Sequence, residues 1–261
     1  MTTASGNKDQ YDEVANEYNS YSEEVPMYRL EAELIRKALG DCTGLTVLDL
    51  GGGSGTHARQ AIAAGASRVD VVDISDAMLQ IGRDIEAKSS TESRIRWLLA
   101  DASKPMSEQG VDVPAGQYDL AMANWVFDHA HNPDDLRAMW ANIVASLKPG
   151  GRFVGIRIYA AAGSSGSIAD PGKYGCLLTE LKEIPGGIGC VATLLTTPPF
   201  SFGATLMEDS YTLANKIPKE LGMTNFEIFP YSDADVIKED PGFWKDYVDA
   251  PSFLVLTANK A

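Results

Sequence analysis

A glycine-rich turn between a strand and a helix is the feature that most constrains this fold. Residues 47–50 (VLDL) form a short, largely apolar run that is typical of a buried strand, and four of residues 51–55 (GGGSG) are glycine. Residues 56–64 (THARQAIAA) follow with the spacing and composition of a helix. Glycine adopts backbone angles that other residues avoid, and a ligand can approach its bare backbone closely. Since the first amides of the helix point into the same space and favour a carboxylate or a phosphate, the turn predicts a cofactor-binding loop.

The spacing of the glycines narrows the choice of cofactor. The dinucleotide pattern G-x-G-x-x-G fails, because its third glycine, counted from Gly51, would fall on Thr56. No Gly-Lys-Ser/Thr ending is present for a phosphate loop. The sequence fits D-x-G-x-G-x-G from Asp49 through Gly51 and Gly53 to Gly55, and the leading acid suits a ligand with a cationic amine. An ordinary strand-to-helix turn is the alternative interpretation.

This motif resembles the first motif of the class I S-adenosylmethionine-dependent methyltransferases. Two further stretches extend the resemblance: residues 11–18 match the Tyr-Asp-x-x-Ala-x-x-Tyr opening of many small-molecule methyltransferases, and residues 147–151 (LKPGG) match another family signature. The resemblance covers roughly residues 11–158 and weakens afterwards. It implies a Rossmann-like fold, S-adenosyl-L-methionine as the cofactor and S-adenosyl-L-homocysteine as the product.

A second acid follows the next predicted strand, residues 68–73 (RVDVVD). Asp73 lies 24 positions after Asp49 (73 − 49 = 24), which is the strand–helix–strand distance at which a carboxylate meets a ribose in nucleoside-binding folds. A helix N-cap is the alternative role, although Ser75 or Asp76 is better placed for it. The apolar neighbours Ile74 and Met78 are predicted to enclose the adenine.

The resemblance implies roles for two strand ends further along the chain. In the family, an acid after the third strand, here in residues 95–101, accepts from the adenine amino group, which implies a cofactor contact for Asp101 beside Ala102. The segment after the fourth strand, residues 117–124, lines the methionine part of the cofactor and the reaction centre. This implies Asn124 as a cofactor residue, and it implies two acceptor residues, Trp125 and His129.

Histidine has the pKa of a general base, so His129 is the candidate catalytic residue. A structural role in its loop is the alternative, because the resembled family carries a histidine here in enzymes of quite different chemistry. The three histidines and the nearby carboxylates form no known metal-ligand spacing, so no metal is predicted.

Tyrosines crowd the start of the chain. Tyr11 and Tyr18 share one helical face, and Tyr21 follows. In the resembled enzymes this segment covers the cofactor and faces the substrate, which implies Tyr18 as a cofactor residue and Tyr11 and Tyr21 as acceptor residues. A lid of this kind would exclude water from methyl transfer. Plain packing of the tyrosines against the core is the alternative.

The order of predicted elements indicates an α/β fold: a doubly wound, mostly parallel seven-stranded sheet with an antiparallel last strand and a small inserted β cap. We expect the cap to hold a hairpin of residues 189–197 and 200–207, and residues 208–221 to form one helix. The predicted parts are an N-terminal helical lid (1–40), the cofactor-binding core (41–158), the inserted substrate cap (159–207) and a C-terminal completion of the sheet (208–261).

The composition of the chain limits the kinds of partner that it can bind. The formal net charge is −14 and no Lys/Arg cluster is present, which excludes the basic patch that nucleic acid requires. No apolar run approaches a membrane span, and the three cysteines form no even disulfide set. We expect a cytoplasmic protein, monomeric or homodimeric, without nucleic acid or membrane partners.

The predicted function is methyl transfer to nitrogen or oxygen of a small, non-ionic or cationic organic acceptor, of the kind found in secondary metabolism. Two alternatives stay open: a protein that binds the cofactor but catalyses a non-methylating reaction such as a cyclisation, and a non-catalytic binding protein.

Overall fold

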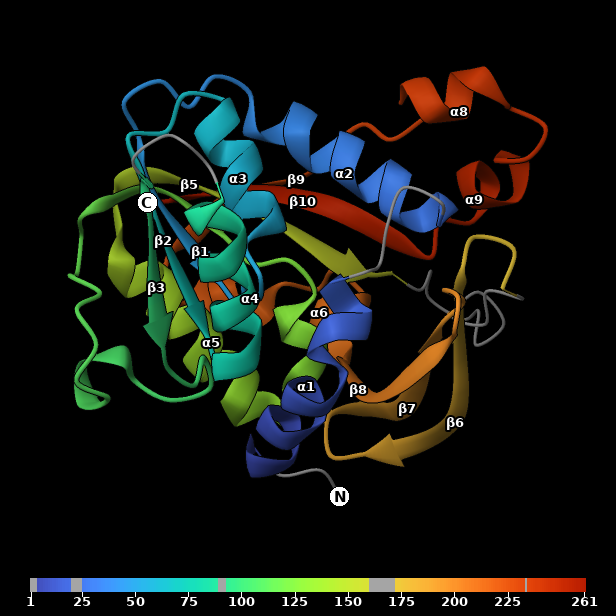
Figure 1. Ribbon diagram of the computed structural model, residues 1–261, viewed down its shortest axis with the longest axis horizontal. Helices are drawn as coiled ribbons and strands as arrows, with labels where there is room; N and C mark the ends of the chain where they lie inside the picture. The colour runs from blue at the N-terminus through green and yellow to red at the C-terminus, as the bar shows by residue number, and fades with distance from the viewer. Residues whose placement is uncertain (1–3, 20–24, 89–92, 160–171, 233) are drawn as a thin grey trace.

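A seven-stranded sheet with helices on both faces forms the centre of the structure (Figure 1). The computed structural model describes residues 4–19, 25–88, 93–159, 172–232 and 234–261. The strand order is β3-β2-β1-β4-β5-β10-β9, and β10 runs antiparallel to both of its neighbours. The predicted mostly parallel sheet with an antiparallel last strand is therefore confirmed. Its strands are β1 (Thr46–Leu50), β2 (Arg68–Asp73), β3 (Ile95–Leu99), β4 (Tyr118–Met122), β5 (Leu147–Ile158), β9 (Met223–Ile228) and β10 (Phe253–Lys260).

The sheet separates two apolar clusters, because successive residues of a strand point to opposite faces of a sheet. Val47 and Val71 belong to the cluster on one face, whereas Leu48 and Val72 belong to the cluster on the other. Residues of five helices complete the first cluster: α2 (Pro26–Leu39), α3 (Thr56–Ala63), α4 (Asp76–Ala87), α8 (Asp235–Glu239) and α9 (Lys245–Asp249). The second cluster is completed by α5 (Pro133–Ser146), α7 (Lys216–Glu220) and the 3₁₀ turns η1 (Met106–Glu108) and η2 (Val126–His129).

The inserted cap is a separate antiparallel sheet of three strands, β6 (Cys176–Ile184), β7 (Gly187–Leu194) and β8 (Phe200–Met207). The predicted β cap is confirmed, and the predicted hairpin is present as the antiparallel pair β7 and β8, but the prediction missed the third strand, β6. The middle of β6 reads Thr-Glu-Leu-Lys-Glu and is exposed, so it lacks the apolar alternation by which strands are recognised. Edge strands of this kind tolerate charge, which also protects them from pairing with other chains.

The predicted single helix over residues 208–221 is also corrected. The structure has two short helices there, α6 (Glu208–Tyr211) and α7, separated by Leu213 and Asn215 at φ values of 57° and 52°. Pro218 could not continue a longer helix, since it lacks the amide hydrogen and its ring clashes with the preceding turn. The break also turns the Asn215 side chain inward, where its Oδ1 accepts a 2.7 Å hydrogen bond from the buried Arg157.

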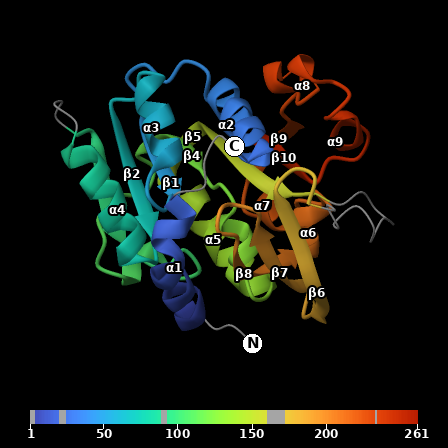
Figure 2. The same cartoon turned by 45° about the vertical axis from the view of Figure 1, so that its right-hand side comes forward.

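The first helix, α1 (Ala4–Asn19), lies between the core and the cap; Figure 1 and Figure 2 both show it between α4 and β8. On the core side, Ser75 Oγ donates to Asp12 Oδ1 at 2.6 Å. On the cap side, the Gln10 amide exchanges two hydrogen bonds with the backbone of Gly203, at 2.8 and 3.3 Å. The helix therefore joins the seven-stranded core to the cap.

Within the part of the chain that the structure describes, no helix is both long and apolar enough to cross a bilayer.

Candidate functional site

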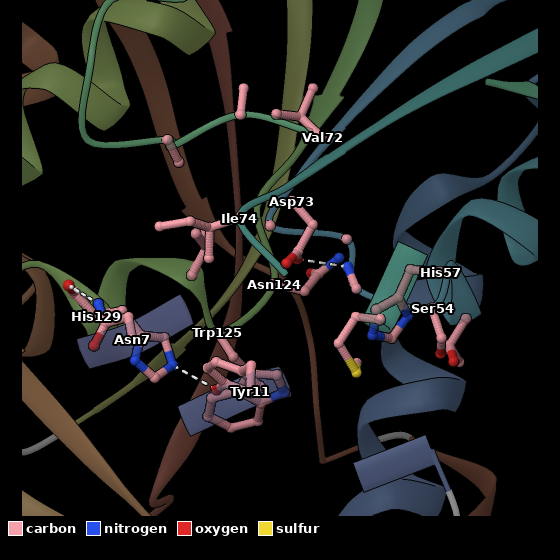
Figure 3. A pocket seen from close by; sticks show the side chains of 18 of the residues that line it. Asn7, Tyr11, Ser54, His57, Val72, Asp73, Ile74, Asn124, Trp125 and His129 are labelled. Atoms are coloured by element: carbon pink, nitrogen blue, oxygen red, sulfur yellow. Dashed lines mark hydrogen bonds between the residues drawn. The ribbon is translucent and has the colours of Figure 1, made fainter. Parts of the chain in front are cut away.

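A cavity of about 390 Å³ lies where the parallel strands β1, β2, β3 and β4 end (Figure 3). The glycine loop forms one wall, with Gly51 and Gly53 at φ values of 70° and 55°. A Cβ atom on Gly51 would lie 2.5 Å from the Cβ of Val126, and one on Gly53 would lie 2.9 Å from the terminal methyl of Met78. Only glycine satisfies both the backbone angles and the lack of space, so the loop presents bare backbone to the cavity.

Asp73 enters the cavity from the end of β2 and orders the loop opposite. Its Oδ2 accepts from the Gly53 amide and its Oδ1 from the Ser75 amide, both at 2.9 Å. Ser75, not Asp73, caps α4, because its hydroxyl accepts from the Met78 amide at 3.1 Å. Burial raises the pKa of Asp73, although these backbone hydrogen bonds oppose the shift. The carboxylate is thus held rigidly at the cavity wall, with Ile74 beside it.

The ends of β3 and β4 bring the remaining predicted cofactor residues to the same cavity. Asp101 and Ala102 line it from one side, and Asp101 Oδ1 accepts from the hydroxyl and amide of Ser103 at 2.6 and 2.9 Å. Asn124 lines it from the other side. Its Oδ1 accepts from the Ile156 amide at 3.2 Å, while its Nδ2 is buried without a hydrogen-bond partner among the described residues. That amide is a free donor at the cavity wall.

Asp49 differs from the other predicted cofactor residues because it lies beneath the glycine loop and not in the cavity lining. It is 1% exposed, and neither carboxylate oxygen has a hydrogen-bond partner among the described residues. Burial, with a smaller contribution from the charge of Asp73, raises its pKa to about 7. A buried acid without a partner is costly, and a cationic ligand held in the loop would lower that cost.

Helix α1 meets the loop after β4, which contains η2, at one side of the cavity. The Tyr11 hydroxyl lies 2.7 Å from His129 Nε2, and the two rings meet edge to face with centroids 5.2 Å apart. Asn7 Nδ2 donates to the His129 carbonyl at 3.2 Å, so α1 contacts this loop twice (Figure 3). Burial lowers the pKa of His129 to about 4, with a smaller effect from His131, so the imidazole is neutral near pH 7. This contact accommodates both the catalytic and the structural interpretation of His129.

Two predicted tyrosines are not placed by the structure. The side chain of Tyr18, at the end of α1, and the whole of Tyr21 lie outside the described residues. Their predicted roles stay predictions.

Trp125 and Glu31 form a pair of which the sequence analysis predicted only the first member. Trp125 has a φ of 64°, and its indole Nε1 donates to Glu31 Oε2 at 2.9 Å. Glu31 is 3% exposed and comes from α2, and burial raises its pKa to about 8 despite that hydrogen bond. A signal was available: Glu31 is four residues after Met27 and three before Leu34, so it falls on the apolar face of its helix.

A second cavity, of about 50 Å³, lies between η2 and the cap. Four residues line both this cavity and the larger one: Tyr11, Glu31, Trp125 and His129. Asp128 lines only the smaller one. It is 5% exposed, its Oδ2 has no hydrogen-bond partner among the described residues, and burial raises its pKa to about 8 while Arg157 opposes the shift.

The cap is attached directly to this loop. The hydroxyl of Thr205, on β8, donates to the Ala130 and Asp128 carbonyls at 2.5 and 3.1 Å. The smaller cavity is therefore bounded by the loop below and the cap above. Its lining is apolar except for a few side chains; the apolar residues are Met27, Ile158, Leu178, Ala192, Leu194, Phe202 and Ala204.

The fold and the larger cavity define a class of protein: an α/β domain that binds a nucleoside-bearing ligand at the carboxyl ends of its strands. Residues 47–151 match the family model described as a methyltransferase domain. The chain is 30% identical over 131 residues to the ubiquinone/menaquinone biosynthesis C-methyltransferase UbiE of Ectopseudomonas mendocina, a match that covers 49% of this chain and 47% of that protein. The chain thus spans about half the length of the curated relatives it matches.

Solved structures resemble nearly the whole chain. The CcbJ methyltransferase from Streptomyces caelestis superposes with a TM-score of 0.63 at 19% identity, covering 97% of each chain. The [4+2]-cyclase SpnF superposes with a TM-score of 0.59 at 16% identity, covering 100% of this chain and 97% of that one. At these identities the likeness concerns the fold.

Over residues 47–151 the chain matches a methyltransferase domain, and its fold is that of solved structures of the S-adenosylmethionine-dependent methyltransferase family. S-adenosyl-L-methionine, the cofactor of that family, fits the residues present: a bare glycine loop, a cavity-facing carboxylate at Asp73, an unpaired amide donor at Asn124 and the unpaired buried acid Asp49. No group of three or more histidine, cysteine or acidic side chains suited to a metal ion occurs among the described residues.

Proposed function

We propose that this protein transfers the methyl group of S-adenosylmethionine to nitrogen or oxygen of a small organic acceptor. The observation that carries the proposal is the meeting of two cavities: the larger one has the features of a cofactor site, and the smaller one opens beside it under the cap. The four residues common to both cavities mark the point where cofactor and acceptor would meet.

We assign the cofactor residues as follows. Asp73 accepts from the ribose hydroxyls, which a carboxylate does better than a neutral side chain. Ile74 and Met78 enclose the adenine, and Asp101 accepts from its amino group beside Ala102. The Asn124 amide and the backbone of Gly51 and Gly53 hold the methionine part. These assignments are supported by the positions of the side chains around one cavity.

The cofactor supplies a methyl group already activated on a sulfonium, so the chain's own residues mainly position and shield the reactants. Tyr11 and Trp125 are placed to orient the acceptor. Helix α1 and the cap, joined through Gln10 and Gly203, exclude water from the junction. Because the formal net charge of the chain is −14, a small acceptor suits the protein better than a polyanion does.

A thermal-shift titration tests cofactor binding. S-adenosylhomocysteine at 100 times its dissociation constant should stabilise the native state by about 2.7 kcal/mol, because it binds only that state. A response to NAD and none to either sulfur ligand would contradict the proposal.

Transfer itself is tested with methyl-labelled S-adenosylmethionine and a panel of amines, phenols and alcohols. Label in an acceptor supports the proposed function. Binding of the cofactor without transfer to any acceptor supports the second candidate, a non-methylating reaction. The similarity in fold to a structure that is named as a cyclase favours keeping this candidate.

A further inference from the structure

Building on the proposed function, we propose that the methyl acceptor is an amine carried on an apolar body, and that Glu31 binds its ammonium form and takes the proton that frees the nitrogen lone pair. Glu31 lines both cavities, so its carboxylate lies at the junction where acceptor and cofactor would meet.

The Glu31 carboxylate accepts one hydrogen bond and has no cation to balance it. Its Oε2 accepts from the Trp125 indole at 2.9 Å, and no lysine, arginine or histidine among the described residues forms an ion pair with it. The residue is 3% exposed, so it is largely shielded from bulk water. Since acids are rarely buried unless they are paired, the arrangement points to a cation supplied from outside the chain.

The charges around the smaller cavity favour the same conclusion. No lysine or arginine occurs among its described lining residues, whereas two acids do, Glu31 and Asp128. The positive charge of Arg157 lowers the pKa of Asp128, although Arg157 does not line the cavity. Its guanidinium lies 4.8 Å from the centre of the Trp140 ring and donates a hydrogen bond to Asn215. Asp128 is therefore partly balanced within the protein.

Arg59, the arginine in the lining of the larger cavity, already interacts with other groups of the protein. Its Nη1 donates to the Ser54 carbonyl at 2.8 Å, and its charge acts on Glu86 and Asp49. Among the described charged residues, Glu31 is thus the acid at the junction that lacks a cation.

The remaining walls determine the body of the acceptor. On its cap side the smaller cavity is lined by aliphatic side chains, by Cys176 and by the Phe202 ring. A carboxylate or phosphate on the acceptor would face two acids and no base, which disfavours anionic substrates. An ammonium group on an apolar skeleton matches both the charge and the surface.

Proton transfer to Glu31 completes the chemistry. An alkylamine is protonated near pH 7, and its nitrogen has no lone pair until a proton leaves. The proton passes from the ammonium to Glu31 Oε1; the nitrogen pair then forms the bond to the methyl carbon, and the carbon–sulfur bonding pair stays on sulfur. The products are the methylated ammonium, a neutral thioether and protonated Glu31.

Glu31 suits this step better than the neighbouring imidazole does. Burial raises the pKa of Glu31 to about 8 and lowers the pKa of His129 to about 4. In the carboxylate form, which a bound ammonium favours over the protonated form, Glu31 is therefore the stronger base of the two. His129 remains a positioning residue through its contact with Tyr11.

The test uses aryl- and alkylamines, each paired with the alcohol of the same carbon skeleton, titrated by calorimetry into the protein saturated with S-adenosylhomocysteine. At least one amine should bind ten times or more tightly than its alcohol. In Glu31→Gln that preference should fall to within about twofold, while the affinity for S-adenosylhomocysteine stays within about twofold. The substituted side chain keeps a carbonyl oxygen for the Trp125 indole, so the variant removes charge and basicity and keeps the packing.

The matched control is Glu239→Gln, which makes the same change at an exposed acid paired with Arg29, a residue of the helix that carries Glu31. It should keep the amine preference of the wild type. Methyl transfer to the preferred amine, followed by mass spectrometry of the N-methyl product, should fall at least a hundredfold in Glu31→Gln only.

Two outcomes overturn the inference: a panel in which no amine binds better than its alcohol, or an amine preference that survives in Glu31→Gln. Both are distinct from failure of the proposed function. That failure would appear as no binding of S-adenosylhomocysteine in the first titration, or as cofactor binding with no transfer to any acceptor.

Discussion

The hydroxyl of Tyr11 lies 2.7 Å from Nε2 of His129, although the two residues are 118 positions apart. This contact ties the first helix of the chain to the loop after β4, at the junction of the two cavities. A helix that contacts the loop after β4 at such a point can couple a movement of its own to the arrangement of the cavity walls. The lid proposed for residues 1–40 is therefore best tested at Tyr11.

Tyr11→Phe should lower kcat/KM more than it lowers stability. The ring still packs against Phe202, so loss of the hydroxyl should cost about 0.5–1.5 kcal/mol of unfolding free energy. If the contact holds the lid, kcat/KM should fall about tenfold or more, which corresponds to about 1.4 kcal/mol or more. Steady-state kinetics measures kcat/KM, and urea unfolding measures the free energy of unfolding. Tyr211→Phe, on the cap side and outside both cavity linings, is the control; a normal kcat/KM in Tyr11→Phe would show that Tyr11 is ordinary packing.

Asp73→Ala should weaken cofactor binding. Removal of a charged hydrogen-bond partner costs about 1.5–3 kcal/mol, which is roughly a 10- to 150-fold rise in Kd for S-adenosylhomocysteine. The Kd of Asp73→Asn should lie between those of the wild type and Asp73→Ala, because its amide oxygen can still accept a hydrogen bond from Gly53 or Ser75. Calorimetry measures both, with Asp76→Ala at an exposed site on α4 as the control. Unchanged affinity in Asp73→Ala would remove this residue from the site.

The ligand-free protein should lose stability as the pH rises from about 5 to about 8. Burial raises the pKa of Glu31 from 4.5 to about 8, so the native state holds a proton that the unfolded state has released. The stabilisation is fully present below pH 4.5 and disappears as the pH passes through the native pKa. Each such group contributes a slope of up to about −1.4 kcal/mol per pH unit in between. Asp128, also at about 8, contributes with the same sign.

Urea unfolding across that pH range checks the slope in wild type and in Glu31→Gln. The variant should lose stability more slowly with pH, by up to about 1.4 kcal/mol per unit, because its amide does not titrate. Parallel curves would indicate that the native Glu31 has an ordinary pKa.

Arg157→Ala should destabilise the fold strongly. Arg157 is 1% exposed, is packed over the Trp140 ring and is bonded to Asn215. Its removal leaves a cavity beside the Trp140 ring and takes the donor from the buried Asn215 Oδ1, a loss that by itself costs about 1–3 kcal/mol. Arg157→Met should cost less, because an apolar chain of similar length fills the space.

Denaturant unfolding compares these two variants with Arg137→Ala, which breaks an exposed pair with Glu220 and should cost below about 1 kcal/mol. Similar losses in all three variants would contradict this account of Arg157.

Local patterns were sufficient to predict the centre of the fold. Residues 47–55 predict a strand and a glycine loop, and the acids at 73 and 101 each follow an apolar strand. Parallel strands joined by helices place their carboxyl ends at one edge, so these groups could be expected to meet before any coordinate was known. The structure places Asp73 and Asp101 at one cavity, and it places Asp49 just behind the loop.

Local patterns failed where charge or long-range packing decided the outcome. Strand β6 is a polar edge strand that forms by pairing with β7. The residues of β6 themselves carry no sequence pattern that predicts this pairing. The helix expected over residues 208–221 is interrupted around Asn215, whose side chain bonds Arg157 on a distant strand.

The sequence by itself therefore determined the class of fold and the edge of the sheet where the larger cavity lies, because these follow from short-range periodicity and from the few topologies open to parallel strands. The cofactor was implied by the resemblance of the glycine loop and its flanking motifs to a known family. Only the tertiary structure placed Glu31 against Trp125, 94 positions away, and put both beneath the cap. A buried acid is recognised by what surrounds it, and those surroundings are assembled from separate stretches of the chain. The charge of the smaller cavity is for this reason a property of the folded protein.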